Sequence, residues 1–115
     1  MKVRLVQILI PLLTLSSFLA QAQEHSVARQ WNEVLLESIR NDFARPTVHA
    51  RNLFHTSVAM YDAWAAYEDD AETFFLGKTL NGYTCEFDGI AAPADKKAAQ
   101  EEAIAYASYR LLRHR

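Results

Sequence analysis

Four polar side chains that could take part in acid–base or ligand chemistry lie within one stretch, residues 45–67. They are His49, Arg51, His55 and Asp62. Imidazole, guanidinium and carboxylate groups can transfer protons, hold an anion or bind a metal ion. His55 and Asp62 are two helical turns apart with no third ligand between them, so the ligand count disfavours a metal site. We interpret these residues as a solvated polar face, or as a face that packs against another domain.

Short catalytic and binding motifs are missing from the sequence. It contains no glycine-rich phosphate loop, no His-Glu-x-x-His, no Gly-x-Ser-x-Gly and no CxxC. The other two histidines, His25 and His114, lie outside the polar stretch. We therefore predict no catalytic, cofactor-binding or metal-binding residue in this chain. Cys85 is the only cysteine, and we expect a half-buried residue in a turn region; pairing with a cysteine outside this chain is the alternative.

The polar stretch itself predicts a long helix over about residues 46–68. Pro46 suits a first helical turn, because its missing N–H would have no helical partner there in any case. No glycine or proline follows until Gly77. At about 100° per residue the apolar side chains collect into one stripe, which we expect to be buried. The stripe consists of Leu53, Ser57, Met60 and Trp64, widened by Phe54, Tyr61 and Tyr67.

The polar residues take two different positions on this helix. Arg51, His55 and Asp62 project together from the side opposite the apolar stripe. We expect them to form a surface cluster that stabilises the helix only modestly. His49 lies at the edge of the stripe and is expected to be partly buried.

Two further helices are predicted, over about residues 26–43 and 95–115. Ser26 and Asp95 are their expected N-caps. The link between the first two helices is short, so these helices are expected to be antiparallel neighbours. The last helix has an apolar, small-residue side, and its pattern continues to Arg115 with no stop signal. This last feature predicts a truncated chain.

Asp42 falls inside the apolar arc of the first predicted helix. Polar residues in such a position need a partner. Because aspartate is frequent in turns, we expect Asp42 to end the helix and cap the turn before Pro46. A hydrogen bond between helices is the alternative.

Residues 72–92 are predicted to form a long irregular loop or a short hairpin. Asn81-Gly82 is a strong turn signal. The segment is long for a structureless connection, so we expect a cover packed over the core. The predicted fold class is therefore all-α, with three main helices forming a partial domain of a larger helical bundle.

The N-terminus reads as a secretory signal peptide over residues 1–22. Lys2 and Arg4 precede an apolar run, and Ala20-Gln21-Ala22 fits the small-x-small cleavage pattern. We expect export to the periplasm or the extracellular space, leaving 23–115 as the mature chain; an N-terminal membrane anchor is the alternative. Cleavage removes two basic residues and no acidic ones, so the formal net charge would change from −2 to −4. This acidic balance predicts no nucleic-acid partner and no membrane partner after signal removal.

Several strings of the mature chain resemble the N-terminal helices of bacterial vanadium-dependent haloperoxidase-like proteins, which belong to the type 2 phosphatidic acid phosphatase superfamily. The resemblance covers nearly all of residues 23–115. Its strings are Ala28-Arg29-Gln30-Trp31-Asn32, Arg45-Pro46-Thr47-Val48-His49-Ala50-Arg51-Asn52-Leu53-Phe54-His55, Ala59-Met60-Tyr61-Asp62-Ala63-Trp64, Leu80-Asn81-Gly82-Tyr83-Thr84-Cys85 and Tyr109-Arg110-Leu111-Leu112-Arg113-His114-Arg115.

The resemblance implies an N-terminal scaffold that lacks the vanadate or phosphate site and is inactive alone. The family pattern is a Lys before Arg-Pro, then Ser-Gly-His, then an Arg and a His. Arg45-Pro46 does not match it, because Ser38 stands seven residues earlier and no Ser-Gly-His follows. Vanadate is thus expected only in a full-length relative, and the implied partners are missing C-terminal catalytic helices.

Three functional alternatives stay open at this point. The first is the haloperoxidase-like scaffold. The second is a small exported helical binding or structural protein without catalysis. The third is a fragment of a superfamily acid phosphatase, which only residues outside this chain could distinguish from a peroxidase. A homo-oligomer is an open possibility for each of them.

Overall fold

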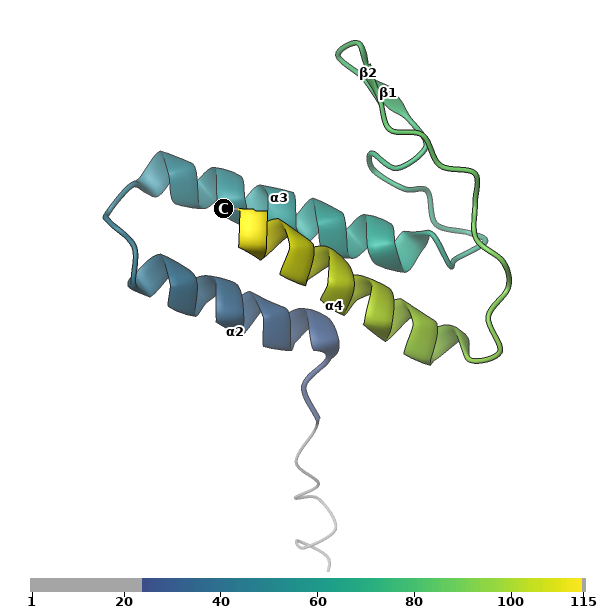
Figure 1. Cartoon of the computed structure of the whole chain (residues 1–115), viewed down its shortest axis with the longest axis horizontal. Helices are drawn as coiled ribbons and strands as arrows, with labels where there is room; N and C mark the ends of the chain where they lie inside the picture. Colours follow the sequence, from purple (N-terminus) through teal and green to yellow (C-terminus); the bar gives the residue numbers. More distant parts are fainter. Residues whose placement is uncertain (1–23, 115) are drawn as a thin grey trace, which may run out of the picture.

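The computed structural model describes residues 24–114, so the predicted signal peptide and Arg115 lie outside the described part. Three helices and one small two-stranded sheet make up the fold (Figure 1). They are α2 (Val27–Arg40), α3 (Pro46–Ala65), β1 (Thr79–Leu80), β2 (Tyr83–Thr84) and α4 (Lys96–His114). The all-α prediction is confirmed. No helix among the described residues is long and apolar enough to cross a bilayer.

Helix α2 begins at the predicted N-cap. Ser26 has an extended backbone (ψ 152°), and its side-chain oxygen accepts a hydrogen bond from the backbone N–H of Arg29 at 3.3 Å. The helix ends at Arg40, about a turn before the predicted limit of residue 43. Asn41 is its C-cap, and the Asn41 amide donates to the carbonyl oxygen of Glu37 at 2.9 Å. The early end follows from this side-chain cap, which closes the last turn.

Asp42 belongs to the link between α2 and α3, as predicted. Its carboxylate accepts hydrogen bonds from the backbone N–H of Phe43 at 2.7 Å and from the guanidinium of Arg45 at 2.8 and 2.7 Å. These hydrogen bonds lower the pKa of Asp42 below its usual range, and those from Arg45 have the largest effect. The alternative of a hydrogen bond between helices is wrong, since both partners lie within the link.

The turn also receives a side chain from α3. His49 is partly buried, as predicted, and its Nε2 lies 2.9 Å from the carbonyl oxygen of Phe43. The same atom lies 3.3 Å from the backbone nitrogen of Arg45. Helices α2 and α3 run antiparallel on either side of this turn (Figure 1), which confirms the predicted arrangement.

Helix α4 packs across both of the other helices and holds the fold together. Its N-cap is Asp95, whose carboxylate accepts from the backbone N–H of Ala98 at 3.0 Å, as predicted. At the same end, Lys96 and the Gln100 amide bind the two carboxylate oxygens of Glu68 at 2.5 and 2.7 Å. The Gln100 amide also donates to the carbonyl oxygen of Trp64 at 3.3 Å. These contacts join the C-terminal end of α3 to the first turns of α4.

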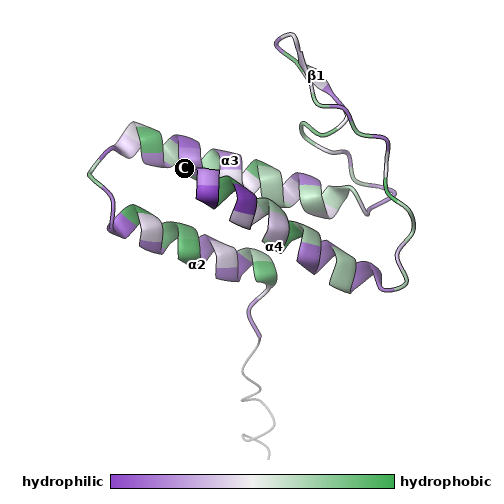
Figure 2. Ribbon diagram, viewed as in Figure 1, coloured by the Kyte–Doolittle hydropathy of each residue, from purple (hydrophilic) through white to green (hydrophobic). Residues whose placement is uncertain are grey.

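The core of the three helices is small. Its buried apolar residues are Leu35, Met60, Ala65 and Ile104, and its fully buried polar residues are Thr56 and Ser108. The Thr56 hydroxyl donates to the carbonyl oxygen of Asn52 at 2.9 Å, whereas the buried Ser108 hydroxyl has no hydrogen-bond partner. Figure 2 shows apolar residues on all three helices, and many of them lie outside this core.

The predicted burial of the α3 stripe is largely wrong within the described residues. Met60 is buried, but Leu53 and Trp64 are exposed by 39% and 38%. The reason is that α4 covers one side of α3 while α2 contributes few contacts to it. Phe54 and Tyr61 are also exposed, at 55% and 42%. An apolar surface therefore runs along α3.

The pH dependence of stability should report the Glu68 contacts. Hydrogen bonds from Lys96 and Gln100 lower the pKa of Glu68 below its ordinary value. The Glu68 carboxylate therefore stabilises the fold fully at a pH above the pKa of unfolded glutamate. This stabilisation is lost as the pH falls through the lowered pKa of the folded state. We expect Glu68→Gln to lower the melting temperature at pH 7 and to flatten its fall as the pH drops below the ordinary pKa of glutamate. Thermal melts followed by circular dichroism measure both effects.

The matched control is Glu86→Gln, because Glu86 is exposed and lies outside the contact between α3 and α4. Its melting curve should follow the parent protein at each pH. A Glu68→Gln variant with an unchanged acid profile would show that the ion pair contributes nothing to folding.

Candidate functional site: the loop clamp on helix α3 and the apolar grooves beside it

Asp62 makes the most heavily bonded side-chain contact between α3 and the loop that follows it. Only 8% of the residue is exposed. Its carboxylate accepts hydrogen bonds from three successive backbone N–H groups, those of Phe74 at 2.5 Å, Phe75 at 2.9 Å and Leu76 at 2.9 Å. Hydrogen bonds to an ionised acceptor are stronger than neutral ones. We call this arrangement the Asp62 clamp.

The predicted Arg51–His55–Asp62 surface cluster is wrong for Asp62. That carboxylate turns toward residues 74–76 and is buried by them, while Arg51 and His55 are exposed. The physical reason is that three neighbouring backbone N–H groups in an irregular loop need hydrogen-bond acceptors. Such donors need an acceptor when they are taken from water, and Asp62 supplies it.

Two further hydrogen bonds hold the start of the loop. The Tyr61 hydroxyl donates to the carbonyl oxygen of Glu72 at 2.9 Å. The Thr73 hydroxyl donates to the carbonyl oxygen of Leu76 at 2.6 Å, within the loop itself. Together with Asp62, neighbouring residues of α3 therefore bind both ends of the segment 72–76.

The hairpin continues from this anchored segment, which confirms the predicted short hairpin. Residues 79–84 are all exposed, so the expectation of a cover packed over the core is wrong for the hairpin itself. We use the name cover for residues 72–85. Strands β1 and β2 pair antiparallel, with Leu80 opposite Tyr83. Asn81 and Gly82 form the turn with φ of 51° and 82°, the left-handed values that a two-residue hairpin of this type requires. The ladder is extended by Gly77 and Cys85, since the N–H of Gly77 donates to the carbonyl oxygen of Cys85 at 2.8 Å.

Aromatic side chains attach this cover to α3 and to itself. The ring of Phe74 packs edge-on against Phe54 of α3, with centroids 5.9 Å apart. The ring of Phe75 stacks on Tyr83 of the hairpin at 5.7 Å and an interplanar angle of 13°. Because Phe74 and Phe75 also donate to Asp62, the clamp sets the positions of both ring contacts.

A wide apolar groove of about 860 Å³ lies between α3, this cover and the C-terminal half of α4. We call it the cover groove. Aromatic and aliphatic side chains from all three elements form most of its wall. Its lining includes Phe54, Val58, Ala63, Phe74, Phe75, Leu76, Leu80, Tyr83, Ala107 and Leu111, together with His55, Asp62 and Cys85.

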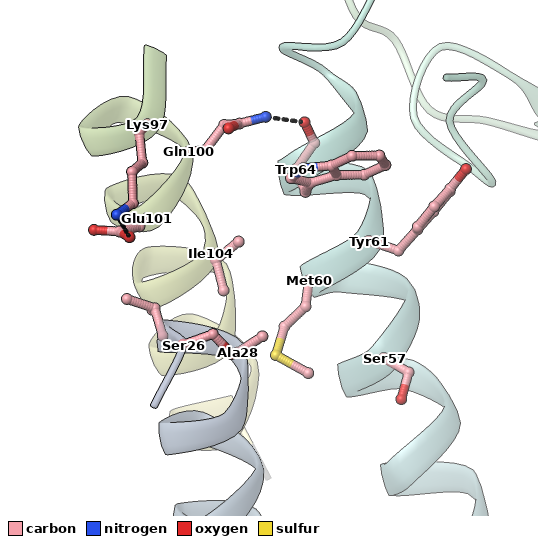
Figure 3. A pocket seen from close by; sticks show the side chains of 11 residues that line it. Ser26, Ala28, Ser57, Met60, Tyr61, Trp64, Lys97, Gln100, Glu101 and Ile104 are labelled. Atoms are coloured by element: carbon pink, nitrogen blue, oxygen red, sulfur yellow. Dashed lines mark hydrogen bonds and ion pairs between the residues drawn. The ribbon is translucent and has the colours of Figure 1, made fainter. Parts of the chain in front are cut away.

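A second apolar groove of about 470 Å³ lies between the N-terminal end of α2, helix α3 and helix α4 (Figure 3). Met60, Trp64 and Ile104 form its apolar wall. Figure 3 shows Gln100 at one end, where its amide reaches the carbonyl oxygen of Trp64. Lys97 and Glu101 lie beside it and bind each other at 3.7 Å. This groove is smaller in volume than the cover groove and is lined from three helices.

The residues considered for chemistry from the sequence do not come together. His25 lies in a separate polar hollow with Glu24 and Arg29, and His49 lies at the turn between α2 and α3. His55 and the half-buried Cys85 both line the cover groove. Within residues 24–114, no group of three or more His, Cys, Asp or Glu side chains is placed to hold a metal ion.

The described residues do not fit a vanadate or phosphate ion. The backbone N–H groups of residues 74–76 converge as an anion-binding nest would, but the Asp62 carboxylate already occupies them. A carboxylate at this position repels a second anion. The cover groove is otherwise largely apolar, so what the arrangement can do chemically is bind apolar surface.

One sequence signal could have revealed the clamp. Asp62 is the only acidic residue in α3, and the segment after that helix contains Gly77, whose φ of 76° ends the clamped loop. A lone carboxylate in a helix with many apolar residues indicates a buried acceptor when the neighbouring loop must satisfy its own N–H groups. The identity of residues 74–76 as its donors depends on the tertiary fold.

Comparisons with known protein families, with characterised proteins and with solved structures find no match to this chain.

Removing the Asp62 carboxylate should destabilise the fold and release the cover. For Asp62→Ala we expect a loss of about 3 kcal/mol, because three part-buried N–H groups lose a charged acceptor. Asp62→Asn keeps one acceptor oxygen and should lose less. Urea unfolding followed by circular dichroism gives the free energies.

Asp88→Ala removes an exposed carboxylate from the same connection and serves as the control. It should leave the free energy of unfolding within about 0.5 kcal/mol of the parent. Equal effects of Asp62→Ala and Asp88→Ala would contradict the clamp.

Proposed function

We propose that the chain is a helical scaffold of an exported vanadium haloperoxidase-like protein, and that it packs against further helices which carry the vanadate or phosphate site. The proposal comes from the resemblance of the motif strings on α2 and α3 to that family. The observation that carries it further is the apolar surface along α3. The scaffold itself performs no oxidation or hydrolysis.

The α3 surface has the composition of a packing face. Leu53, Phe54, Tyr61 and Trp64 expose between 38% and 55% of their surface. Single exposed apolar residues are ordinary, but these four share one side of α3 at about 100° per residue, and such a grouping favours a surface that another element covers. Fully burying an exposed side chain of this size contributes about 1.5–3 kcal/mol, and docking would bury the exposed part that remains on each of these four. Helices docked on this face would therefore add substantially to a core that is small in residues 24–114.

The Asp62 clamp is consistent with a supporting role. It holds the cover by bonds within the chain, and its carboxylate leaves no anion site in the nest. In this proposal the oxyanion is held by cations and amides from the other helices, which this scaffold positions.

A second candidate is a small exported binding protein, favoured by the cover groove. Its volume of about 860 Å³ and its apolar wall fall within the range of small-molecule sites. A phosphatase scaffold of the same superfamily is a third candidate, with the same packing role and different partner helices.

The scaffold proposal is tested by the behaviour of the chain without its partner helices. We expect the protein expressed from the 115-residue sequence to be helical and to bind the dye ANS. The cover groove could also take the dye, and the double variant separates the two sites. If the α3 surface is the dye site, Leu53→Gln combined with Trp64→Gln should reduce the fluorescence at unchanged helical circular dichroism.

Dye binding by the parent and its loss in the double variant support a packing face. Fluorescence that is unchanged in the double variant would contradict the packing face and favour the binding protein, whose cover groove would then hold the dye. The DNA after the Arg115 codon gives an independent check, because the proposal expects a further coding region with Ser-Gly-His in the same frame or in an adjacent gene.

This chain with added vanadate should show no detectable oxidation of bromide. Measurable turnover would also contradict the proposal.

A further inference from the structure

One exposed line of side chains on α4 is not used by the scaffold. It consists of Glu102, Tyr106, Tyr109 and Arg113, which we call the α4 stripe. All four are exposed, the two tyrosines by 61% and 44%. At about 100° per residue they fall on one narrow line along the helix. The opposite side of α4, with Ile104 and Ser108, is buried against the other helices.

The α4 stripe is self-complementary when it is read in the two directions. Its residues are separated by steps of four, three and four positions, so the spacing is the same from either end. In an antiparallel copy, Glu102 stands opposite Arg113, and Tyr106 stands opposite Tyr109. A carboxylate thus meets a guanidinium at both ends, with four aromatic rings between them. The same steps of four and three form the seam of paired helices.

The charged end of the stripe is already ordered within one chain. The guanidinium of Arg113 lies 5.6 Å from the ring centroid of Tyr109 and donates to its hydroxyl at 3.0 Å. The guanidinium of Arg110 lies 5.9 Å from the ring of Tyr106. Arginine has five donors in a fixed fork, so Arg113 can keep its tyrosine contact and still bind a carboxylate. Side chains held in this way lose less entropy on binding.

We propose that a second copy of this chain docks antiparallel along the α4 stripe, on a two-fold axis between Tyr106 and Tyr109. The occupant is a second copy because the stripe provides both halves of its own complement, as an isologous two-fold interface requires. Tyrosine and arginine are also the residues that most often dominate interface energies.

The position of α4 leaves this surface open. Helix α4 lies across α2 and α3 in Figure 1, and its hydrophilic C-terminal end is purple in Figure 2. The apolar surface that the scaffold uses is on α3, so the two contacts are separate. Four residues from each copy form a small contact, and the dimer is therefore expected to dissociate on dilution and to weaken with salt.

Two charge reversals test the antiparallel pairing. Glu102→Arg gives each copy two positive ends, and Arg113→Glu gives each copy two negative ends. Each variant alone should be monomeric by analytical ultracentrifugation at concentrations where the parent protein dimerises. Mixed in equal amounts, the two variants place opposite charges together at both ends, so the mixture should recover the dimer. Circular dichroism checks that each variant keeps its helices.

Arg29→Glu is the control, because it reverses an exposed charge in the first turn of α2, where an acidic residue suits the helix N-terminus. It should dimerise as the parent does. A parent protein that stays monomeric up to about millimolar concentration would overturn the proposal. A mixture that remains monomeric, or single variants that dimerise unchanged, would overturn it as well.

Discussion

The bonds between Asp62 and the backbone of residues 74–76 are the constraint on which the rest of this structure depends. An irregular loop that returns over a helix takes its N–H groups out of water and must find acceptors for them. Here one carboxylate accepts all three. Because the acceptor stands on α3, the path of the loop is fixed relative to that helix, and the hairpin that follows is fixed with it.

The grooves and exposed faces follow from that constraint and from a small core. The clamp places Phe74 against Phe54 and Phe75 against Tyr83, which forms one wall of the cover groove. The fully buried residues that α3 and α4 contribute include Thr56 and Ser108, whose small side chains fill little volume. The remaining large apolar residues of α3 are left at the surface, and this surface is the physical basis for proposing a scaffold.

Local features of the fold could be predicted from the sequence because their causes are local. Ser26 and Asp95 cap helices, Pro46 opens one, and Asn81-Gly82 turns the hairpin, each through contacts within a few residues. The burial of α3 could not be predicted in the same way. A helical projection shows that Leu53 and Trp64 share a side with Met60, but only the position of α4 decides which of them is covered.

The candidate site shows the same division between local and distant causes. The placement of Asp62 among the surface residues failed because its partners lie 12 to 14 positions further along the chain. Asp42, whose contacts are local, took its predicted position in the link between α2 and α3, and His49 is partly buried as predicted. The pattern of residue types on a single helix cannot predict that the N–H groups of a distant loop will need an acceptor there.

Hydrogen exchange at the backbone amides of Phe74, Phe75 and Leu76, followed by NMR, tests the clamp most directly. If the Asp62 carboxylate holds these amides, all three should exchange slowly in the parent protein, and Asp62→Ala should return them to rates near those of the exposed residues 88–90. The backbone amides of the fully buried residues Thr56 and Ser108 should exchange more slowly than those of the loop in both proteins. Fast exchange at residues 74–76 in the parent would contradict the clamp and with it the placement of the cover.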